Sequence, residues 1–131
     1  MKMRITFGIT GLLATSMAYA SAVNLIEGYR NAGAGPFSPN AGGSAWTQEH
    51  QSSSGVDTRS CARCHGSDLT QPGRHVKTGK PIEPMAPSVN PARLGDPKKV
   101  EKWFRRNCRW TLGRECTPQE KGNFIQYMSS Q

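Results

Sequence analysis

The spacing of apolar positions along the chain predicts helices, and the clearest of them follows Asp96. An aspartate before a proline is typical of a helix start, because its carboxylate accepts from free backbone N–H groups and proline fits the first turn. Beyond it, residues at helical spacing fall on one face: Val100, Trp103, Phe104, Asn107 and Cys108. Asn107 is the one amide on this otherwise apolar face.

Two further helices have similar start signals. Ser38 before Pro39 predicts a helix that runs to about Gln51. Thr117, with Glu120 three residues later, forms a capping box and begins a last helix. The apolar side of that last helix carries Phe124, Tyr127 and Met128. In addition, residues 24–31 can form a short helix.

Glycines and prolines dominate the connections between these helices. Five prolines lie between residues 66 and 96: Pro72, Pro81, Pro84, Pro87 and Pro91. No segment shows a convincing strand pattern, so we expect a small all-α fold with long Pro/Gly-rich loops. Gly42 and Gly122 would allow the first and last of these helices to cross closely, unless both are simply tolerated at the surface.

The N-terminus is typical of a secretory signal. Lys2 and Arg4 precede an apolar run that is too short for a permanent membrane span, and residues 18–20 (AYA) form a small-x-small cleavage site. We expect residues 1–20 to be a signal peptide cleaved near Ala20, although a retained anchor is the alternative. Residues 21–131 would then form a single exported, periplasmic domain, with an irregular extension over about residues 21–37.

Length and charge limit what this domain can do. The 111 residues that remain can bury only a thin core. Without Lys2 and Arg4, the domain has 15 basic and nine acidic side chains, which gives a formal charge of +6. That charge favours an acidic protein partner or an anionic surface. Nucleic acid is a poor candidate partner, because the chain is exported and its basic residues are scattered. Nothing argues against a monomer.

The main chemical motif is Cys61-Ala62-Arg63-Cys64-His65. This C-x-x-C-H pattern attaches a c-type haem: the two thiols form thioethers and the histidine binds the iron. A zinc site would need a second pair of ligands at similar spacing, and a thiol-disulfide pair would need a βαβ context. With an export signal, the motif predicts one covalent haem c and a class I cytochrome c fold, with His65 as proximal ligand.

The opposite face of the iron has several candidate ligands: Met85, Met128, His75 and His50. Met85 lies on a proline-rich loop, where many class I cytochromes place a thioether ligand. Met128 is better suited to packing in the core, and His75 is expected at the surface. Asn107 is a further candidate, because an amide on an apolar face needs a partner. That partner would be either the backbone at the end of its helix or the iron.

The remaining cysteines, Cys108 and Cys116, are expected to form a disulfide in an oxidising compartment. A loop of this size would contribute roughly 2–3 kcal/mol by the chain-entropy estimate. Two free buried thiols are the alternative. The disulfide would fix the backbone directly after Asn107.

Three segments resemble the sphaeroides haem protein family, whose members are unusual monohaem class I cytochromes c. The segments are residues 79–87 (GKPIEPMAP), 100–108 (VEKWFRRNC) and 112–122 (LGRECTPQEKG). The resemblance extends over about residues 60–127 and is weak before residue 57. The adjacent asparagine and cysteine are its most specific part.

The resemblance implies a role for each site residue. His65 would be the proximal ligand and Asn107 the distal ligand of the ferric iron, beside the Cys108–Cys116 disulfide. On reduction Asn107 would leave, opening a site for oxygen, nitric oxide or a similar ligand. A dihaem cytochrome c, or another acidic redox protein, would be the electron donor, and oxygen reduction is a further activity that this site allows.

These observations lead to one main functional hypothesis and two rivals. The main hypothesis is an exported cytochrome that takes electrons from another cytochrome and binds a small diatomic ligand at a redox-gated haem. The first rival is a plain electron carrier with His65 and Met85 as ligands. The second is a haem-based gas or redox sensor that signals through a partner.

Overall fold

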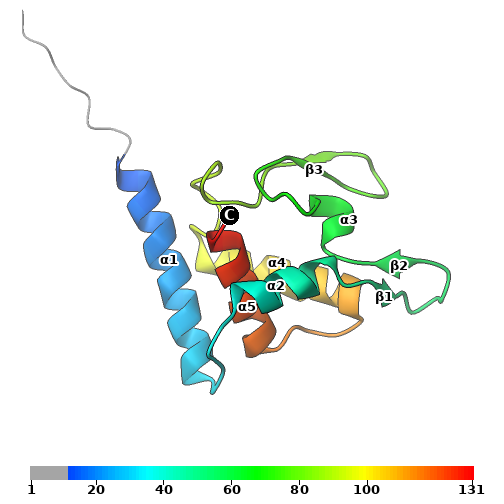
Figure 1. Ribbon diagram of the computed structural model, residues 1–131, viewed down its shortest axis with the longest axis horizontal. Coiled ribbons are helices and arrows are strands. Elements are labelled where there is room, and N and C mark those ends of the chain that lie inside the picture. The colour runs from blue at the N-terminus through cyan, green and yellow to red at the C-terminus, as the bar shows by residue number, and fades with distance from the viewer. Residues whose placement is uncertain (1–11) are drawn as a thin grey trace, which may run out of the picture.

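The computed structural model describes residues 12–131 and consists mostly of helices (Figure 1). The helices are α1 (Leu12–Asn31), α2 (Pro39–Thr47), α3 (Ala62–His65), α4 (Pro97–Leu112) and α5 (Pro118–Ser129). Two short antiparallel hairpins lie between them. The first pairs β1 (His50–Gln51) with β2 (Thr58–Arg59), and the second pairs β3 (Gly73–Arg74) with β4 (Pro81–Ile82).

All three predicted helix starts are confirmed by their capping contacts. The Ser38 side chain accepts from the Ala41 N–H at the start of α2. The Asp96 carboxylate accepts from two backbone N–H groups in the first turn of α4. At the start of α5, Thr117 and Glu120 form both bonds of the capping box. Local chemistry therefore sets where each of these helices begins.

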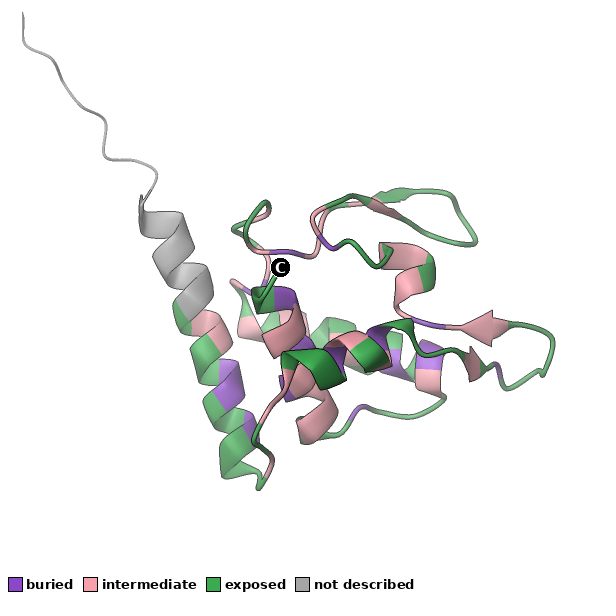
Figure 2. Cartoon of the chain, in the orientation of Figure 1, coloured by how far each residue is buried: buried purple, intermediate pink, exposed green. Residues whose placement is uncertain are grey.

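The core forms where α2 crosses α5, as Figures 1 and 2 show. Gly42 is buried in this crossing, and a Cβ there would lie 2.8 Å from the Tyr127 Cβ and 2.7 Å from the Asn123 carbonyl carbon. The predicted close approach is therefore confirmed for Gly42. Gly122 has a different neighbour, because its missing side chain makes room for the Phe37 ring, whose Cγ would be 2.8 Å from a Cβ.

The structure corrects two predictions about the elements. Helix α2 ends at Thr47 rather than near Gln51, because Gln48 is extended and His50 and Gln51 pair with the next strand. The two hairpins were not expected. Each strand has only two residues, too few to show an alternating pattern.

The N-terminal extension is also corrected. It is helical to Asn31 rather than irregular over residues 21–37, and the proposed cleavage site lies within α1. Leu25, Ile26 and Tyr29 are buried, so one side of this helix packs on the core, chiefly against α5. Most of the predicted signal peptide, residues 1–11, lies outside the described residues.

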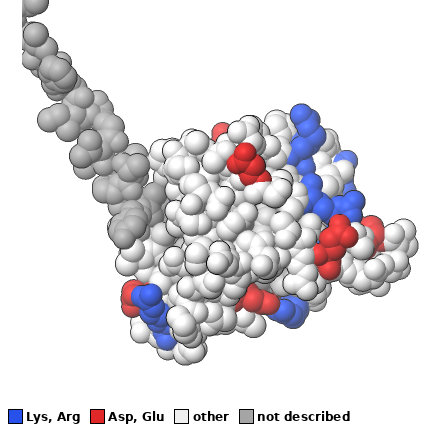
Figure 3. All heavy atoms as spheres, in the orientation of Figure 1, with Lys and Arg blue, Asp and Glu red and all other residues white. Residues whose placement is uncertain are grey.

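Charged side chains are unevenly distributed over the surface. In the view of Figure 3 much of the face carries neither acidic nor basic side chains, and Lys and Arg are found mainly toward its edges. Within residues 12–131, no helix is both long enough and apolar enough to span a membrane.

Candidate haem site

The C-x-x-C-H motif forms a single helical turn. Cys61 has helical backbone angles at the start of α3, and the N–H of His65 donates to its carbonyl at 3.1 Å. This turn places Cys61 and Cys64 three positions apart on one side, and neither forms a disulfide. Burial raises the pKa of the Cys61 thiol to about 11. A redox-active cysteine needs a low pKa, so this environment does not suit a thiol-disulfide pair.

His65 is kept neutral by its surroundings. Its burial, together with the nearby charge of Arg93, lowers the pKa of the imidazole to about 4. The ring lies 5.4 Å from the indole of Trp46, centroid to centroid. Among the described residues, its Nδ1 is the one buried side-chain polar atom without a hydrogen-bond partner. A neutral, half-buried imidazole with one unpaired nitrogen is suited to binding a metal.

Three other parts of the chain hold this turn in place. The β3 strand lies directly against it at Gly73, where a Cβ would be 2.8 Å from the Cα of His65. The Trp46 indole of α2 donates to the Gly66 carbonyl at 2.9 Å. The Tyr127 hydroxyl of α5 donates to the Ser67 carbonyl at 3.2 Å. The motif is therefore anchored to both crossing helices.

Asn107 lies in the body of α4, and this excludes one of its two predicted partners. The helix continues to Leu112 and ends at Gly113, whose left-handed backbone and N–H to the Arg109 carbonyl close the last turn. Asn107 therefore does not cap the end of its helix. Its side chain is exposed, as is Trp103 one turn earlier, and it makes no hydrogen bond within the described part of the chain. No other part of the described chain covers these two side chains.

The other predicted candidates have different surroundings. Met128 is buried in the core, as expected for a packing residue. His75 is exposed, and its Nδ1 accepts from the Lys77 and Thr78 N–H groups of a turn. His50 pairs through its backbone in β1. Met85 is half-buried against the core, and its N–H donates to the Leu69 carbonyl at 3.0 Å.

The predicted disulfide between Cys108 and Cys116 is present, with the two Cα atoms 5.6 Å apart. Both cysteines are buried, so the covalent link fixes the backbone beside Asn107 to the segment before α5. Arg114 lies within the loop that this disulfide closes, and its ion pair with Glu120, at 2.7 Å, joins the loop to the start of α5.

The donor set in α3 fits a covalent haem better than a zinc ion. The thiols of Cys61 and Cys64 are free to form thioethers, and the imidazole of the adjacent His65 is neutral. Within residues 12–131, no group of three or more His, Cys, Asp or Glu side chains gathers as a metal site. The zinc alternative therefore has no second pair of ligands in this part of the chain.

Comparisons with known proteins give a consistent result. A family model described as a domain of unknown function (DUF1924) matches residues 32–128. The chain is 40% identical over 111 residues to the cytochrome c-type protein SHP of Cereibacter sphaeroides, covering 85% of this chain and 84% of the relative. It is 34% identical over 137 residues to cytochrome c'' of Methylophilus methylotrophus, covering 98% and 94%.

Solved structures of the same two proteins have the same fold. Oxidised SHP, an oxygen-binding cytochrome c, aligns with a TM-score of 0.77 and 39% identity over 84% of this chain and 96% of that one. Oxidised cytochrome c'' aligns with a TM-score of 0.76 and 33% identity over 86% and 95%. A solution structure of cytochrome c'' that concerns haem-ligand detachment aligns with a TM-score of 0.67 and 33% identity, over 90% of this chain and 93% of that one.

These findings confirm the predicted cytochrome c fold and its cofactor. The chain carries one haem c, attached through Cys61 and Cys64. Sequence reasoning missed residues far along the chain that contact the motif or act on it through their charge. Gly73 and Arg93 gave no local signal, and the spacing of Trp46 from Gly42 indicated a helix but not a contact with Gly66.

Proposed function

Because this chain belongs to the sphaeroides haem protein family, we propose that it is an exported cytochrome whose reduced haem binds oxygen, nitric oxide or a similar small ligand. When bound, the haem would supply an iron that accepts and releases one electron and can bind a small ligand. In this proposal His65 would bind the iron in both oxidation states, and Asn107 would bind it only while it is ferric. In this proposal Asn107 thus controls whether a small ligand can reach the iron.

The proximal role of His65 is supported by its position and its protonation. The motif ties it to the cofactor through Cys64, the residue directly before it. A pKa of about 4 leaves the ring unprotonated at neutral pH, with a lone pair free to bind. Trp46 and the β3 strand restrict the ring from two sides.

The observation that carries the distal role is the unused amide of Asn107. It lies within α4 and makes no hydrogen bond to any described residue, and it is beside a cysteine that the disulfide fixes. A neutral amide oxygen is a hard donor, which binds ferric iron better than the softer ferrous iron. Reduction would therefore release Asn107. A methionine such as Met85 would instead bind both oxidation states and exclude gases.

The electron donor in this proposal is an acidic redox protein, such as a dihaem cytochrome c in the periplasm. The domain after the predicted cleavage site has a formal charge of +6, which favours association with a partner of opposite sign. Electron transfer to this haem would then prepare it to bind its small ligand.

The test is Asn107→Ala in the holoprotein. We expect azide and cyanide to bind the ferric form at least about tenfold faster, because the protein ligand no longer has to leave first. Carbon monoxide should bind the ferrous form at an unchanged rate, because Asn107 has already left in that state. Both rates are measured by stopped-flow absorption.

Met85→Leu is the control, because Met85 is the rival ligand and lies half-buried against the core. It should leave the ferric spectrum unchanged. A far-red methionine-to-iron band in the wild type that Met85→Leu abolishes would overturn the proposal in favour of a plain electron carrier.

A further inference from the structure

Arg59 connects the segment that attaches the haem to the helix that carries Asn107. We propose that Arg59 is a positioning residue, which holds the last turns of α4 in place so that Asn107 can bind the ferric iron. This inference rests on the proposed role of Asn107. Arg59 was not among the predicted site residues, because a single arginine before the motif forms no pattern and its hairpin was not predicted.

The contacts of Arg59 with α4 are close and specific. Its Nη1 donates to the Trp110 carbonyl at 2.9 Å. Its guanidinium carbon also lies 4.6 Å from the centroid of the Trp110 ring, so the same side chain makes a cation–π contact. The Arg59 side chain is only 18% exposed. An arginine that both donates to and stacks on one residue is restrained in two directions.

The acceptor is one that the helix cannot satisfy itself. The last four carbonyls of a helix lack intrahelical partners, and Trp110 lies two residues before the end of α4 at Leu112. A cation is also favourable at this end of the helix dipole. Arg59 therefore stabilises the final turn of α4, and Asn107 is three residues before Trp110, one turn away.

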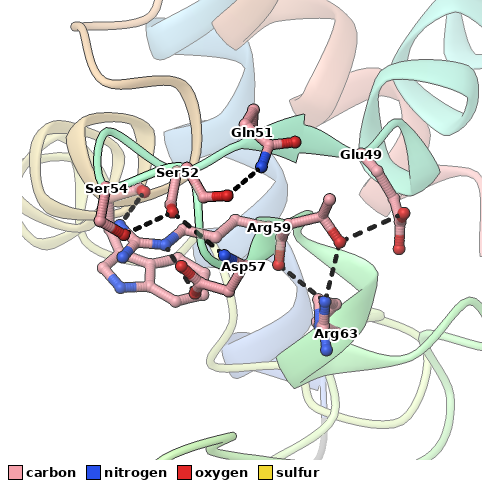
Figure 4. A network of polar contacts seen from close by, with 10 residues as sticks. Glu49, Gln51, Ser52, Ser54, Asp57, Arg59 and Arg63 are labelled. Atoms are coloured by element: carbon pink, nitrogen blue, oxygen red, sulfur yellow. Dashed lines mark hydrogen bonds and ion pairs between the residues drawn. The ribbon is translucent and has the colours of Figure 1, made fainter.

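The other end of the connection is equally fixed. Arg59 lies in β2, two residues before Cys61, so its backbone leads directly into the covalent haem attachment. Its Nε donates to Asp57 at 3.3 Å, and Asp57 is held in turn by Ser52 across the hairpin (Figure 4). The hydrogen bond from Ser52, helped by Arg59, lowers the pKa of Asp57 and keeps its carboxylate ionised.

These contacts place Arg59 between the two sides of the haem site. The covalent attachment fixes the proximal side of the site, and the contacts of Arg59 with Trp110 hold the end of α4 to that side. The disulfide holds Cys108 to the segment before α5, but only Arg59, among the described hydrogen bonds of the β1–β2 hairpin, reaches α4. A weak ligand such as an amide depends on such support, because it binds only when it is held near the iron.

The experiment compares Arg59→Met with Arg109→Met in the holoprotein. Methionine keeps an unbranched apolar side chain but removes the charge and the hydrogen-bond donors. We expect Arg59→Met to bind azide in the ferric form about tenfold faster and to increase the high-spin fraction of the ferric spectrum. Ferrous carbon monoxide binding should not change. Arg109 is the matched control: it also lies near the end of α4, but its side chain is exposed and pairs with exposed Glu115. Its loss should leave the azide rate unchanged.

A double variant separates this inference from the proposed function. If Arg59 acts through Asn107, adding Arg59→Met to Asn107→Ala should not speed azide binding further. A further increase, or an unchanged rate for Arg59→Met alone, would overturn the inference while the role of Asn107 still stands. If Asn107→Ala itself has no effect, the proposed function fails instead. If Arg59→Met does not yield folded holoprotein, Arg59→Lys replaces it in the experiment. Lysine keeps the charge but has no planar guanidinium that could stack on Trp110 while donating to its carbonyl. A wild-type azide binding rate for Arg59→Lys would therefore refute the inference.

Discussion

At the scale of single residues, Gly42 is the position with the least room for change. Replacing it by alanine would place a Cβ 2.8 Å from the Cβ of Tyr127, and backbone on both sides would have to move. We expect Gly42→Ala to lower the free energy of unfolding by about 2–3 kcal/mol, as overpacking of a tight contact does. Guanidinium denaturation of the holoprotein measures this.

Gly28→Ala provides the control for that substitution. Gly28 is also helical, but a Cβ there would meet nothing within 4 Å. This variant should be neutral or more stable by about 0.5–1 kcal/mol, because alanine favours helix formation. Equal destabilisation by the two substitutions would show that loss of glycine, rather than the crossing, is responsible.

The sequence predicted some of these residue roles and missed others for a physical reason. The packing role of Met128 and the close approach at Gly42 follow from helical spacing, and both are confirmed. The partner of Gly122 is the Phe37 ring, which lies outside any predicted helix. The contacts of Gly73 and Arg59 depend on hairpins whose strands are too short to leave a pattern.

At the scale of elements, the start of α5 is stabilised by a carboxylate that should respond to pH. The pKa of Glu120 falls from 4.5 to about 2, chiefly because Arg114 donates to it and also because it accepts from the Thr117 N–H. A lowered carboxyl pKa adds stability above the unfolded value. We therefore expect this contribution to be complete above about pH 4.5 and to be lost as the pH falls toward 2.

Glu120→Gln tests this contribution, because glutamine can still complete the capping box but cannot pair as an anion with Arg114. We expect a loss of about 0.5–1 kcal/mol at pH 7 that disappears near pH 2. Denaturation midpoints at several pH values measure it. Glu115→Gln is the control, since its ion pair with Arg109 is exposed on both sides. If the Glu120→Gln and wild-type curves stay parallel down to pH 2, the carboxylate has no such role.

The starts of the helices could be predicted from the sequence better than their ends and lengths. The starts of α2, α4 and α5 depend on residues within one turn, so their capping signals were sufficient. The end of α2 and the length of α1 depend instead on distant partners. The pairing of His50 with Arg59 ends α2, and the packing of Tyr29 and its neighbours on α5 supports the length of α1.

At the scale of the whole molecule, Glu101 connects three helices. It accepts from the Tyr29 hydroxyl of α1 and from the Lys121 ammonium of α5, the latter at 2.6 Å. Lys121 also lies 5.8 Å from the centroid of the Tyr29 ring. Burial, with Glu101 beside it, raises the pKa of Tyr29, so the hydroxyl remains a donor at neutral pH. Burial alone would raise the pKa of Glu101, but Lys121 and Tyr29 lower it overall.

Glu101→Gln should therefore loosen α1 without disturbing the crossing of α2 and α5. Loss of one charged partner in such a network costs about 1–3 kcal/mol. We expect amide hydrogens of α1 to lose about that much protection in hydrogen exchange, while those of α2 stay protected, because regions open separately. Glu27→Gln, which breaks an exposed ion pair within α1, should change little. The same contribution should depend on pH.

Because the pKa of Glu101 is lowered in the fold, its contribution to the stability of α1 is present above the ordinary carboxyl pKa and is lost as the pH falls through the lowered value. Hydrogen-exchange protection of α1 should therefore fall on acidification in the wild type but not in Glu101→Gln. Equal acid sensitivity in both proteins would show that α1 is held by its apolar contacts alone.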